Sequence, residues 1–309
     1  MASCFALGPQ RPTVNLGLPF KSMASEGAVA LVSAGWQEAE CDFEHVQEAI
    51  SRPLVGLRLY GRAEEVFSGD AQVRHFYRER QNGLMELQRL YRIRLRQSMI
   101  AARRLLREEG DTLTLRHEQR HALSQLRALD RHHLQRINAI HAEFSAEFAE
   151  LTTPVLEQHR AEIAAQLADC DTVLLTGGNV TVLLNRLRLF NIGPLLENKS
   201  IVAWSAGAMA LSDRIILFHD NTAEGNRDAE LIDAGLGIIN KVVFLPDAKH
   251  RLKLADKIRT AIFCRRFAPA SCMTLDSGSL LRFDQGRVSS AEGVRRLSRS
   301  GNLRKVRVR

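Results

Sequence analysis

The sequence predicts an α/β protein, a three-layer α/β/α sandwich with a mainly parallel sheet and a long helical-hairpin insertion. Two observations predict the sandwich. The short apolar runs 172–176 and 201–204 each lead through small residues into a helical segment, which is the strand–turn–helix unit of a parallel sheet. A third observation predicts the insertion, because between residues 70 and 164 the apolar residues recur at steps of three and four.

The chain divides into four segments on this basis. We expect a disordered tail at 1–27, whose first 22 residues hold Gly, Pro and Arg but no acidic residue and no apolar core of a signal peptide. Residues 28–69 and 165–288 form the expected α/β domain. Residues 70–164 form the insertion, and residues 289–309 are expected to form a basic, solvated tail.

Composition and charge exclude several classes of partner. The formal net charge is +8, with much of the excess in the C-terminal tail, but no aromatic residue interleaves with these arginines to stack bases. We therefore expect no nucleic-acid partner. No apolar run approaches the ~18 residues of a membrane span, so we expect no membrane partner. Five scattered cysteines without paired spacing indicate reduced thiols and a cytoplasmic protein.

The first predicted strand of the α/β domain is 29–32, followed by a turn at 33–35. The insertion then shows two apolar stripes separated by Gly110 and Asp111, which predicts two antiparallel helices of about 35 residues, or roughly 50 Å each at 1.5 Å per residue. The stripes consist of Leu84, Leu87, Tyr91, Leu95, Met99, Ala102 and Leu106, then Leu126, Leu129, His133, Ile137, Ile140, Phe144 and Phe148. Their heptad-like spacing predicts that the hairpin pairs with itself, with the parent domain or with a second subunit, and the last of these would make a homo-oligomer.

A short zinc-protease pattern lies inside the insertion. His117, Glu118 and His121 fit H-E-x-x-H, in which two histidines on one helical face bind Zn²⁺ and the glutamate polarises water. Here Arg116 and Arg120 flank the pattern, and their charge opposes a cation. We therefore expect no metal, and no other pattern predicts a cofactor.

The strand at 172–176 ends in Gly177, Gly178 and Asn179, and a helix follows. This turn exposes backbone amides at the end of a parallel strand. The next strand, 201–204, ends in Ser205 and Ala206 within Ser-Ala-Gly-Ala, the small-residue form of a nucleophile elbow. Amides from two neighbouring turns are the donors that an oxyanion hole requires, so we expect Gly178 and Ala206 to serve a Ser205 nucleophile.

The Gly-Gly-Asn turn followed by Ser-Ala-Gly-Ala resembles the serine peptidases that include dipeptidase E and cyanophycinase. The resemblance covers roughly residues 173–265, and it implies a class I glutamine-amidotransferase-like fold. Class I amidotransferases carry cysteine at the elbow, so Ser205 favours hydrolysis. The resemblance also implies that Asp220, after the strand 215–218, is the supporting acid.

The resembling peptidases carry a catalytic histidine after proline at the end of a later strand. In this chain the matching strand, 242–245, ends in Pro246 and Asp247. Either Asp247 replaces the base, or His250, one helical turn further on, reaches back to act as the base. Asp247 also suits the N-cap of the helix that follows.

We therefore predict a serine hydrolase that cleaves a peptide or related small-molecule amide. The alternative is a hydrolase-like protein that has lost its base and binds a ligand or partner, with the hairpin as its interaction surface.

Overall fold

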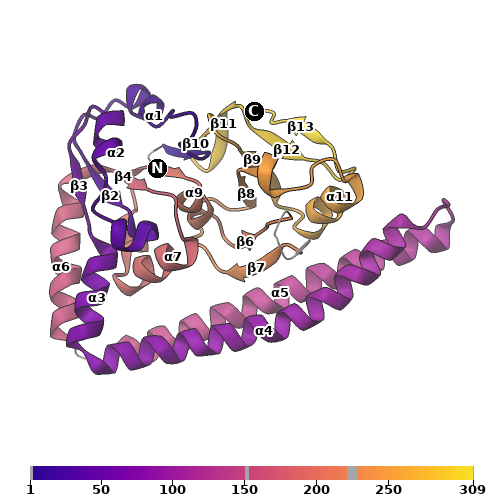
Figure 1. The fold of residues 1–309 in the computed structure, drawn as a ribbon, viewed down its shortest axis with the longest axis horizontal. Coiled ribbons are helices and arrows are strands. Elements are labelled where there is room, and N and C mark those ends of the chain that lie inside the picture. Colours follow the sequence, from indigo (N-terminus) through magenta and orange to yellow (C-terminus); the bar gives the residue numbers. More distant parts are fainter. Residues whose placement is uncertain (1–2, 150–152, 221–227, 309) are drawn as a thin grey trace.

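The computed structural model describes residues 3–149, 153–220 and 228–308. Its largest sheet has seven strands in the order β11-β10-β1-β5-β4-β2-β3, of which β1, β5, β4, β2 and β3 are parallel (Figure 1). The strands are β1 (Cys4–Leu7), β2 (Ala28–Val32), β3 (Leu54–Gly56), β4 (Cys170–Leu175), β5 (Ser200–Trp204), β10 (Leu280–Asp284) and β11 (Arg287–Glu292). The mainly parallel sheet confirms the predicted α/β class.

Helices cover both faces of this sheet. Along β1, Phe5 and Leu7 pack in a cluster with α1 and α2, whereas Ala6 packs in a second cluster with α3, α6, α7 and α9. The helices are α1 (Gly17–Ser22), α2 (Glu44–Ala49), α3 (Leu59–Gly69), α6 (Pro154–Ala168), α7 (Val180–Leu189), α8 (Ile192–Leu195) and α9 (Ala206–Leu211), with the 3₁₀ helix η1 (Ala34–Ala39). Because strand side chains alternate between faces, the sheet buries apolar residues on both sides. The predicted three-layer sandwich is confirmed.

The prediction that the N-terminal segment is a disordered tail is wrong. Strand β1 lies between β5 and β10 inside the large sheet, and its four residues are buried. The amide of Ile201 also donates to the Ser3 carbonyl, 3.0 Å away. Four apolar residues are too few to show a period of two, so the pattern does not distinguish this strand from a tail.

A second sheet has the order β13-β12-β9-β8, and β6 pairs with β7 in a small hairpin. These elements are β6 (Ile215–Leu217), β7 (Glu230–Asp233), β8 (Val242–Pro246), α10 (Ala248–Arg251), α11 (Lys257–Arg266), β9 (Ser271–Leu275), β12 (Arg295–Leu297) and β13 (Leu303–Lys305). Strand β8, which precedes Asp247, therefore belongs to a different sheet from β5, which precedes Ser205.

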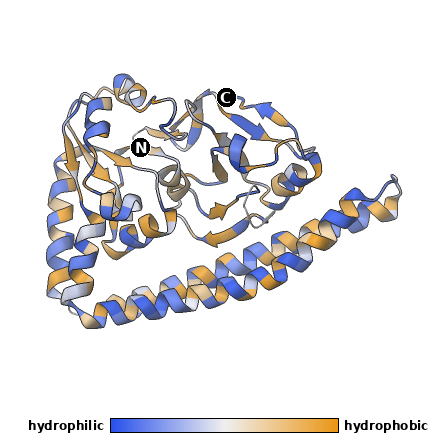
Figure 2. Cartoon of the chain, in the orientation of Figure 1, coloured by the Kyte–Doolittle hydropathy of each residue, from blue (hydrophilic) through white to orange (hydrophobic). Residues whose placement is uncertain are grey.

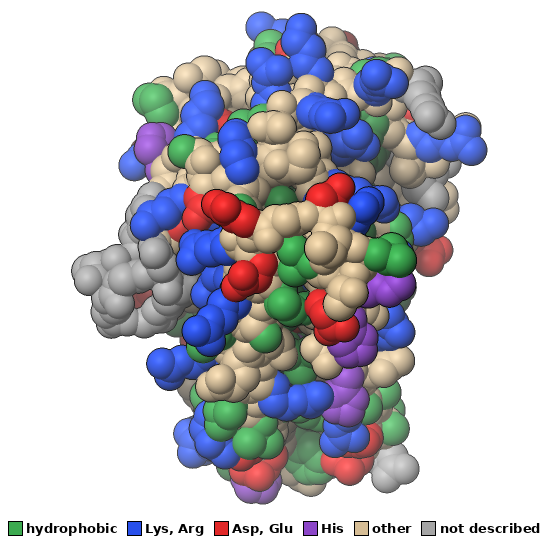
Figure 3. Space-filling view, turned by 90° about the vertical axis from the view of Figure 1, so that its right-hand side faces the viewer, with side chains coloured by type: hydrophobic (Ala, Val, Ile, Leu, Met, Phe, Trp, Pro, Cys, Tyr) green, Lys and Arg blue, Asp and Glu red, His purple; other side chains and the backbone are tan. Residues whose placement is uncertain are grey.

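The expected solvated C-terminal tail at 289–309 is also wrong, because β12 and β13 form one edge of the second sheet. In β12 the side chain of Leu297 is buried in the core, while Arg295 and Arg296 are exposed. Lys and Arg side chains are spread over this end of the molecule (Figure 3). The arginine run resembles a tail in the sequence because β12 has only one buried residue, Leu297, between exposed arginines.

Helices α4 (Ala71–Arg107) and α5 (Leu113–Ala149) form the predicted antiparallel hairpin along one side of the α/β domain (Figure 1). Both helices alternate apolar and polar segments, as Figure 2 shows. Tyr91, Leu95 and Met99 of α4 share one buried cluster with Ile262 and Phe263 of α11. The apolar stripe thus packs against the parent domain as well as within the hairpin, and pairing of two subunits stays a prediction.

Within the described residues, no helix is long and apolar enough to cross a bilayer. All five cysteines are unpaired thiols, and four of them are buried.

Candidate active site

A groove of about 820 Å³ lies where adjacent parallel strands end. It is lined by Pro9, Gln10, Arg11, Pro12, Val14, Leu16, Trp36, Ala39, Asp42, His45, Val46, Glu48, Ala49, Gly177, Gly178, Trp204 and Ser205. These residues follow β1, β2, β4 and β5, which are neighbours in the sheet. Carboxyl ends of parallel strands are the usual position of a ligand site in open α/β sheets.

Ser205 occupies the turn between β5 and α9 with φ 49° and ψ −112°. A non-glycine residue in this region is strained, and such strain is typical of a nucleophile held on a sharp turn. The Ser205 amide donates to the Leu7 carbonyl at 3.1 Å, which fixes the turn to β1. A Cβ on Gly207 would lie 2.3 Å from the Leu175 carbonyl oxygen, so the small residue at this position is required.

The turn after β4 brings Gly177 and Gly178 to the same groove. Gly178 has φ +106°, and a Cβ there would lie 2.3 Å from the Gly35 carbonyl oxygen. A Cβ on Gly177 would lie 3.3 Å from the Cβ of Ser205, so this turn packs directly against the elbow. The structure therefore brings together Gly177, Gly178 and Ser205, as the sequence predicts.

Two backbone amides at this junction have no hydrogen-bond partner in the part of the chain that the structure describes. Among the described residues, neither the Gly178 nor the Ala206 amide donates a hydrogen bond. Asn179 caps α7: its Oδ1 accepts from the amides of Thr181 at 3.0 Å and Val182 at 3.2 Å, and its contact with substrate stays a prediction. Its own amide donates to the Gly35 carbonyl at 2.8 Å. The cap holds the turn, and the two unpaired amides are left as candidate oxyanion donors.

Gly178→Ala is expected to lower reactivity at Ser205 by at least tenfold, because the new Cβ must displace the Gly35 carbonyl and an L residue resists φ +106°. The matched control is Gly193→Ala, since a Cβ at Gly193 meets no atom within 4 Å. Labelling rates with a serine-reactive fluorophosphonate check both variants. Equal rates for the two variants would show that the turn does not serve the serine.

Aromatic side chains form one wall of the groove. Trp36 lies 6.2 Å from Trp204 and stacks on His45 at 5.4 Å between ring centroids. A Cβ on Gly178 would lie 3.0 Å from Trp36 Cδ1, so this ring borders the Gly177–Gly178 turn. Sequence reasoning missed Trp36 and His45, because they belong to the six-residue helices η1 and α2, which are too short for a periodic pattern to single them out.

Another part of the groove lining follows β1, in the segment that the sequence predicts to be a tail. The Gln10 side chain donates to the Gly8 carbonyl at 3.0 Å and to Asn15 Oδ1 at 2.9 Å, and it accepts from the Asn15 amide at 3.0 Å. Asn15 in turn donates to the Ser279 carbonyl at 3.2 Å. These bonds close a loop that carries Arg11 into the groove lining.

Asp247 and His250 form a pair at the end of β8 and lie outside the groove lining. His250 Nδ1 and Asp247 Oδ1 are 2.5 Å apart, and the imidazole is 81% exposed. The hydrogen bond to Asp247 raises the pKa of His250. Asp247 has the left-handed conformation with φ 56°, and its side chain makes no cap hydrogen bond with α10. Asp247 thus occupies the expected N-cap position, but its carboxylate binds His250 and does not cap the helix.

Asp220 lies in a different environment. Its carboxylate is 5% exposed, pairs with Arg259 Nη2 at 2.6 Å and accepts from the Lys253 amide at 2.9 Å. It lines a small pocket with Met99 of the hairpin, and not the groove that holds Ser205. Its assignment as the supporting acid stays a prediction.

The H-E-x-x-H residues His117, Glu118 and His121 are all exposed on α5. In the part of the chain that the structure describes, no group of three or more His, Cys, Asp or Glu side chains is placed to hold a metal ion.

The model of peptidase family S51 matches residues 126–291, more than half of the chain. The chain belongs to this family. The matched segment includes the Gly177–Gly178 turn and Ser205, and it also includes Asp220, Asp247 and His250. Strands β1 and β2, which complete the groove, lie outside it.

Two solved structures are similar over most of their length. A peptidase from an acI-B1 actinobacterium aligns over 97% of this chain and 91% of its own, with 14% identity and a TM-score of 0.47. A putative peptidase E from Listeria monocytogenes EGD-e aligns over 96% of this chain and 100% of its own, with 13% identity and a TM-score of 0.44. No curated protein shows a significant match.

Proposed function

We propose that the protein is a serine hydrolase that cleaves a peptide or related amide bond through Ser205. The observation that carries the proposal is the strained elbow of Ser205 against the Gly177–Gly178 turn, at the edge of a groove large enough for a small peptide. Membership of peptidase family S51 supports the same reaction class.

In the proposed reaction the Ser205 hydroxyl attacks the scissile carbonyl, and a base removes its proton. The carbonyl oxygen becomes an oxyanion, which the amides of Gly178 and Ala206 stabilise by donating hydrogen bonds. Removal of one such donor typically lowers the rate by about 10²–10³-fold. The tetrahedral intermediate then collapses: the C–N bond breaks, and the protonated base gives its proton to the departing amine, which leaves the acyl-enzyme. Water attacks the acyl carbonyl while the base takes its proton, and the base then protonates Ser205 Oγ as the ester C–O bond breaks.

The base is proposed to come from the Asp247–His250 pair. Strand β1 links this pair to the elbow: Leu7 accepts from the Ser205 amide, and the next residue, Gly8, packs against the Asp276 carbonyl. Asp276 Oδ1 accepts from the amide of Lys249 in α10 at 2.9 Å. This connection supports either candidate for the base: His250, oriented by its hydrogen bond to Asp247, or Asp247 itself.

Asp247→His and His250→Ala separate the two assignments. If Asp247 is the base, Asp247→His is expected to raise fluorophosphonate reactivity by about tenfold or more, with a profile that rises near pH 6 to 7. If His250 is the base, His250→Ala abolishes the reactivity. The midpoint of the wild-type pH–rate profile then lies above that of an ordinary histidine, because the hydrogen bond to Asp247 raises the pKa of His250 and the base must be unprotonated.

The second candidate is a ligand-binding or partner-binding scaffold that has lost its base. The observation that favours it is Asp247, where the resembling peptidases carry histidine. Folded wild-type protein that fails to react with a fluorophosphonate between pH 6 and 9 would support the scaffold and contradict the hydrolase.

A further inference from the structure

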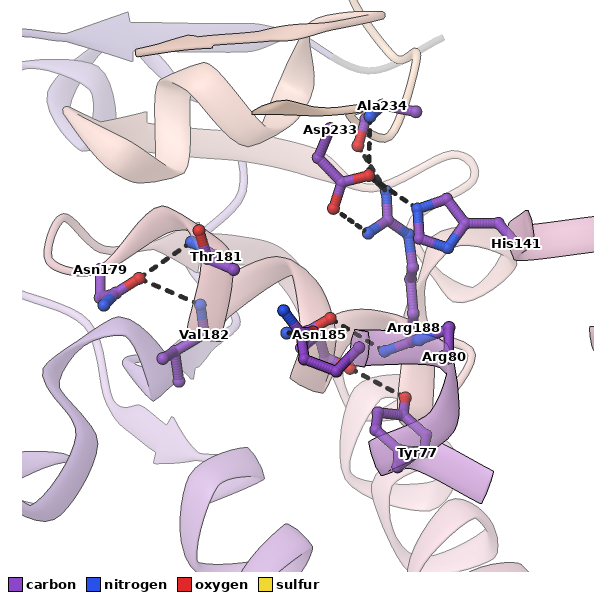
Figure 4. A network of polar contacts seen from close by, with 11 residues as sticks. Tyr77, Arg80, His141, Asn179, Thr181, Val182, Asn185, Arg188, Asp233 and Ala234 are labelled. Carbon is purple, nitrogen blue, oxygen red and sulfur yellow. Dashed lines mark hydrogen bonds and ion pairs between the residues drawn. The ribbon is translucent and has the colours of Figure 1, made fainter. Parts of the chain in front are cut away.

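Helix α7 connects the candidate oxyanion turn to the helical hairpin. It begins at Val180, directly after Gly178 and the capping residue Asn179. Its second half carries Asn185 and Arg188, and both side chains are held by contacts that involve the hairpin (Figure 4). This ten-residue helix thus connects the Gly177–Gly178 turn of the α/β domain with the helical hairpin, which are distant in the sequence.

The first contact is made by α4 on Asn185. The Tyr77 hydroxyl donates to the Asn185 carbonyl at 3.1 Å, and Arg80 Nη2 donates to Asn185 Oδ1 at 2.9 Å. The Arg80 guanidinium is stacked between the rings of Tyr77 at 4.2 Å and Phe144 at 4.6 Å. Arg80 is 6% exposed, so the contact with α7 is held by groups that have little freedom to move.

The second contact joins α5, α7 and β7. The Asp233 carboxylate accepts from Arg188 Nη1 at 2.7 Å and from His141 Nε2 at 2.7 Å. Burial alone would raise the pKa of Asp233, but the hydrogen bond from His141 and the charge of Arg188 lower it overall. Burial lowers the pKa of His141. Because an ionised carboxylate can only accept, the His141 imidazole carries a proton on Nε2.

The other end of α7 is equally fixed. The Asn179 cap ties the first turn of α7 to the Gly-Gly turn, and the Asn179 amide bonds to Gly35 at 2.8 Å. A short α-helix is stiff along its axis because each turn is hydrogen-bonded to the next. A shift of Asn185 or Arg188 is therefore carried to Gly178.

We propose that the helical hairpin positions the oxyanion turn through α7, with Asn185 and Arg188 as positioning residues. This inference rests on the proposed function of Ser205. In this proposal the hairpin affects the reaction by positioning α7, although no hairpin residue lines the groove. Displacement of reacting groups by about 1 Å can lower a rate by about 10²-fold, so a partial release of α7 suffices for a measurable effect.

The first test is the inactivation of the full chain by a fluorophosphonate, analysed as the maximal rate kinact and the half-saturation constant KI. Arg188→Ala is expected to lower kinact by about tenfold and to change KI by less than twofold, because oxyanion stabilisation acts on the transition state. Arg188→Lys should recover part of the loss. Tyr77→Phe, which removes one hydroxyl and keeps the packing, should lower kinact by about threefold.

The matched control is Arg92→Ala. Arg92 also joins the hairpin to the domain, through an ion pair to Glu230 of 2.7 Å, but within the described residues no hydrogen bond or ion pair joins it to α7. We expect kinact within twofold of the wild type for this variant. Equal losses for Arg92→Ala and Arg188→Ala would mean a general loosening of the hairpin, which would overturn the inference. Unchanged kinact in folded Arg188→Ala and Tyr77→Phe would overturn it as well.

Amide hydrogen exchange over residues 177–182 separates this inference from the proposed function. Arg188→Ala should increase exchange there by about tenfold relative to Arg92→Ala, whether or not Ser205 reacts. If exchange is faster in Arg188→Ala but Ser205 of the wild type does not react, the proposed hydrolase function is contradicted, and the coupling between the hairpin and the turn is still supported. Unchanged exchange contradicts the coupling even if Ser205 is labelled.

Discussion

Ser205→Ala is expected to lower the rate of fluorophosphonate labelling by about 10⁴-fold or more, because loss of the nucleophile removes the covalent step itself. The fold should be unaffected. Alanine keeps the Cβ of serine, so the strained backbone at φ 49° is no worse in the variant. Labelling followed by in-gel fluorescence, with circular dichroism for the fold, checks both parts.

Ser145→Ala is the matched control, since Ser145 is exposed on α5, where its hydroxyl donates to the His141 carbonyl. Its labelling rate should equal that of the wild type. Labelling that persists in Ser205→Ala would show that another residue reacts, and it would contradict the role of Ser205 as the nucleophile.

Arg266→Met is expected to lower the free energy of unfolding by about 3–5 kcal/mol, the usual effect of removing one partner from a buried ion pair. The Arg266 side chain is 1% exposed and pairs with Asp130 of α5, with Nε to Oδ2 at 2.7 Å and Nη2 to Oδ1 at 2.8 Å. It also donates to the Tyr91 hydroxyl of α4 at 2.6 Å. Its loss leaves the Asp130 carboxylate buried without its cation.

Denaturant unfolding measures this effect. Arg92→Ala breaks an exposed ion pair and should cost about 1 kcal/mol or less. The double variant Arg266→Met, Asp130→Leu should recover part of the loss, because an apolar pair needs no compensating charge. A loss below about 1 kcal/mol for Arg266→Met would show that this network does not anchor the hairpin to the α/β domain.

The elements around the elbow were predictable because their residue types are constrained by geometry. A residue larger than glycine at 207 or 178 collides with backbone carbonyls, so small residues mark these turns in the sequence itself. The hairpin was predictable because apolar residues must repeat at helical spacing when one face of a long helix is buried.

Other features leave no such mark. Strand β8 is an apolar run like β5, and nothing local tells which sheet each strand joins. Strand β1 is too short to show alternation, and so the loop that carries Arg11 was also missed. The links from α7 to the hairpin depend on polar residues far apart in the chain, such as Arg80 and Asn185, whose pairing only the fold decides.

A crystal structure of the wild-type protein after reaction with a fluorophosphonate tests the central claim most directly. We predict a phosphonyl group on Ser205 Oγ, with one phosphonyl oxygen about 2.7–3.1 Å from the amides of both Gly178 and Ala206. An adduct on another residue, or a phosphonyl oxygen turned away from both amides, would contradict the account.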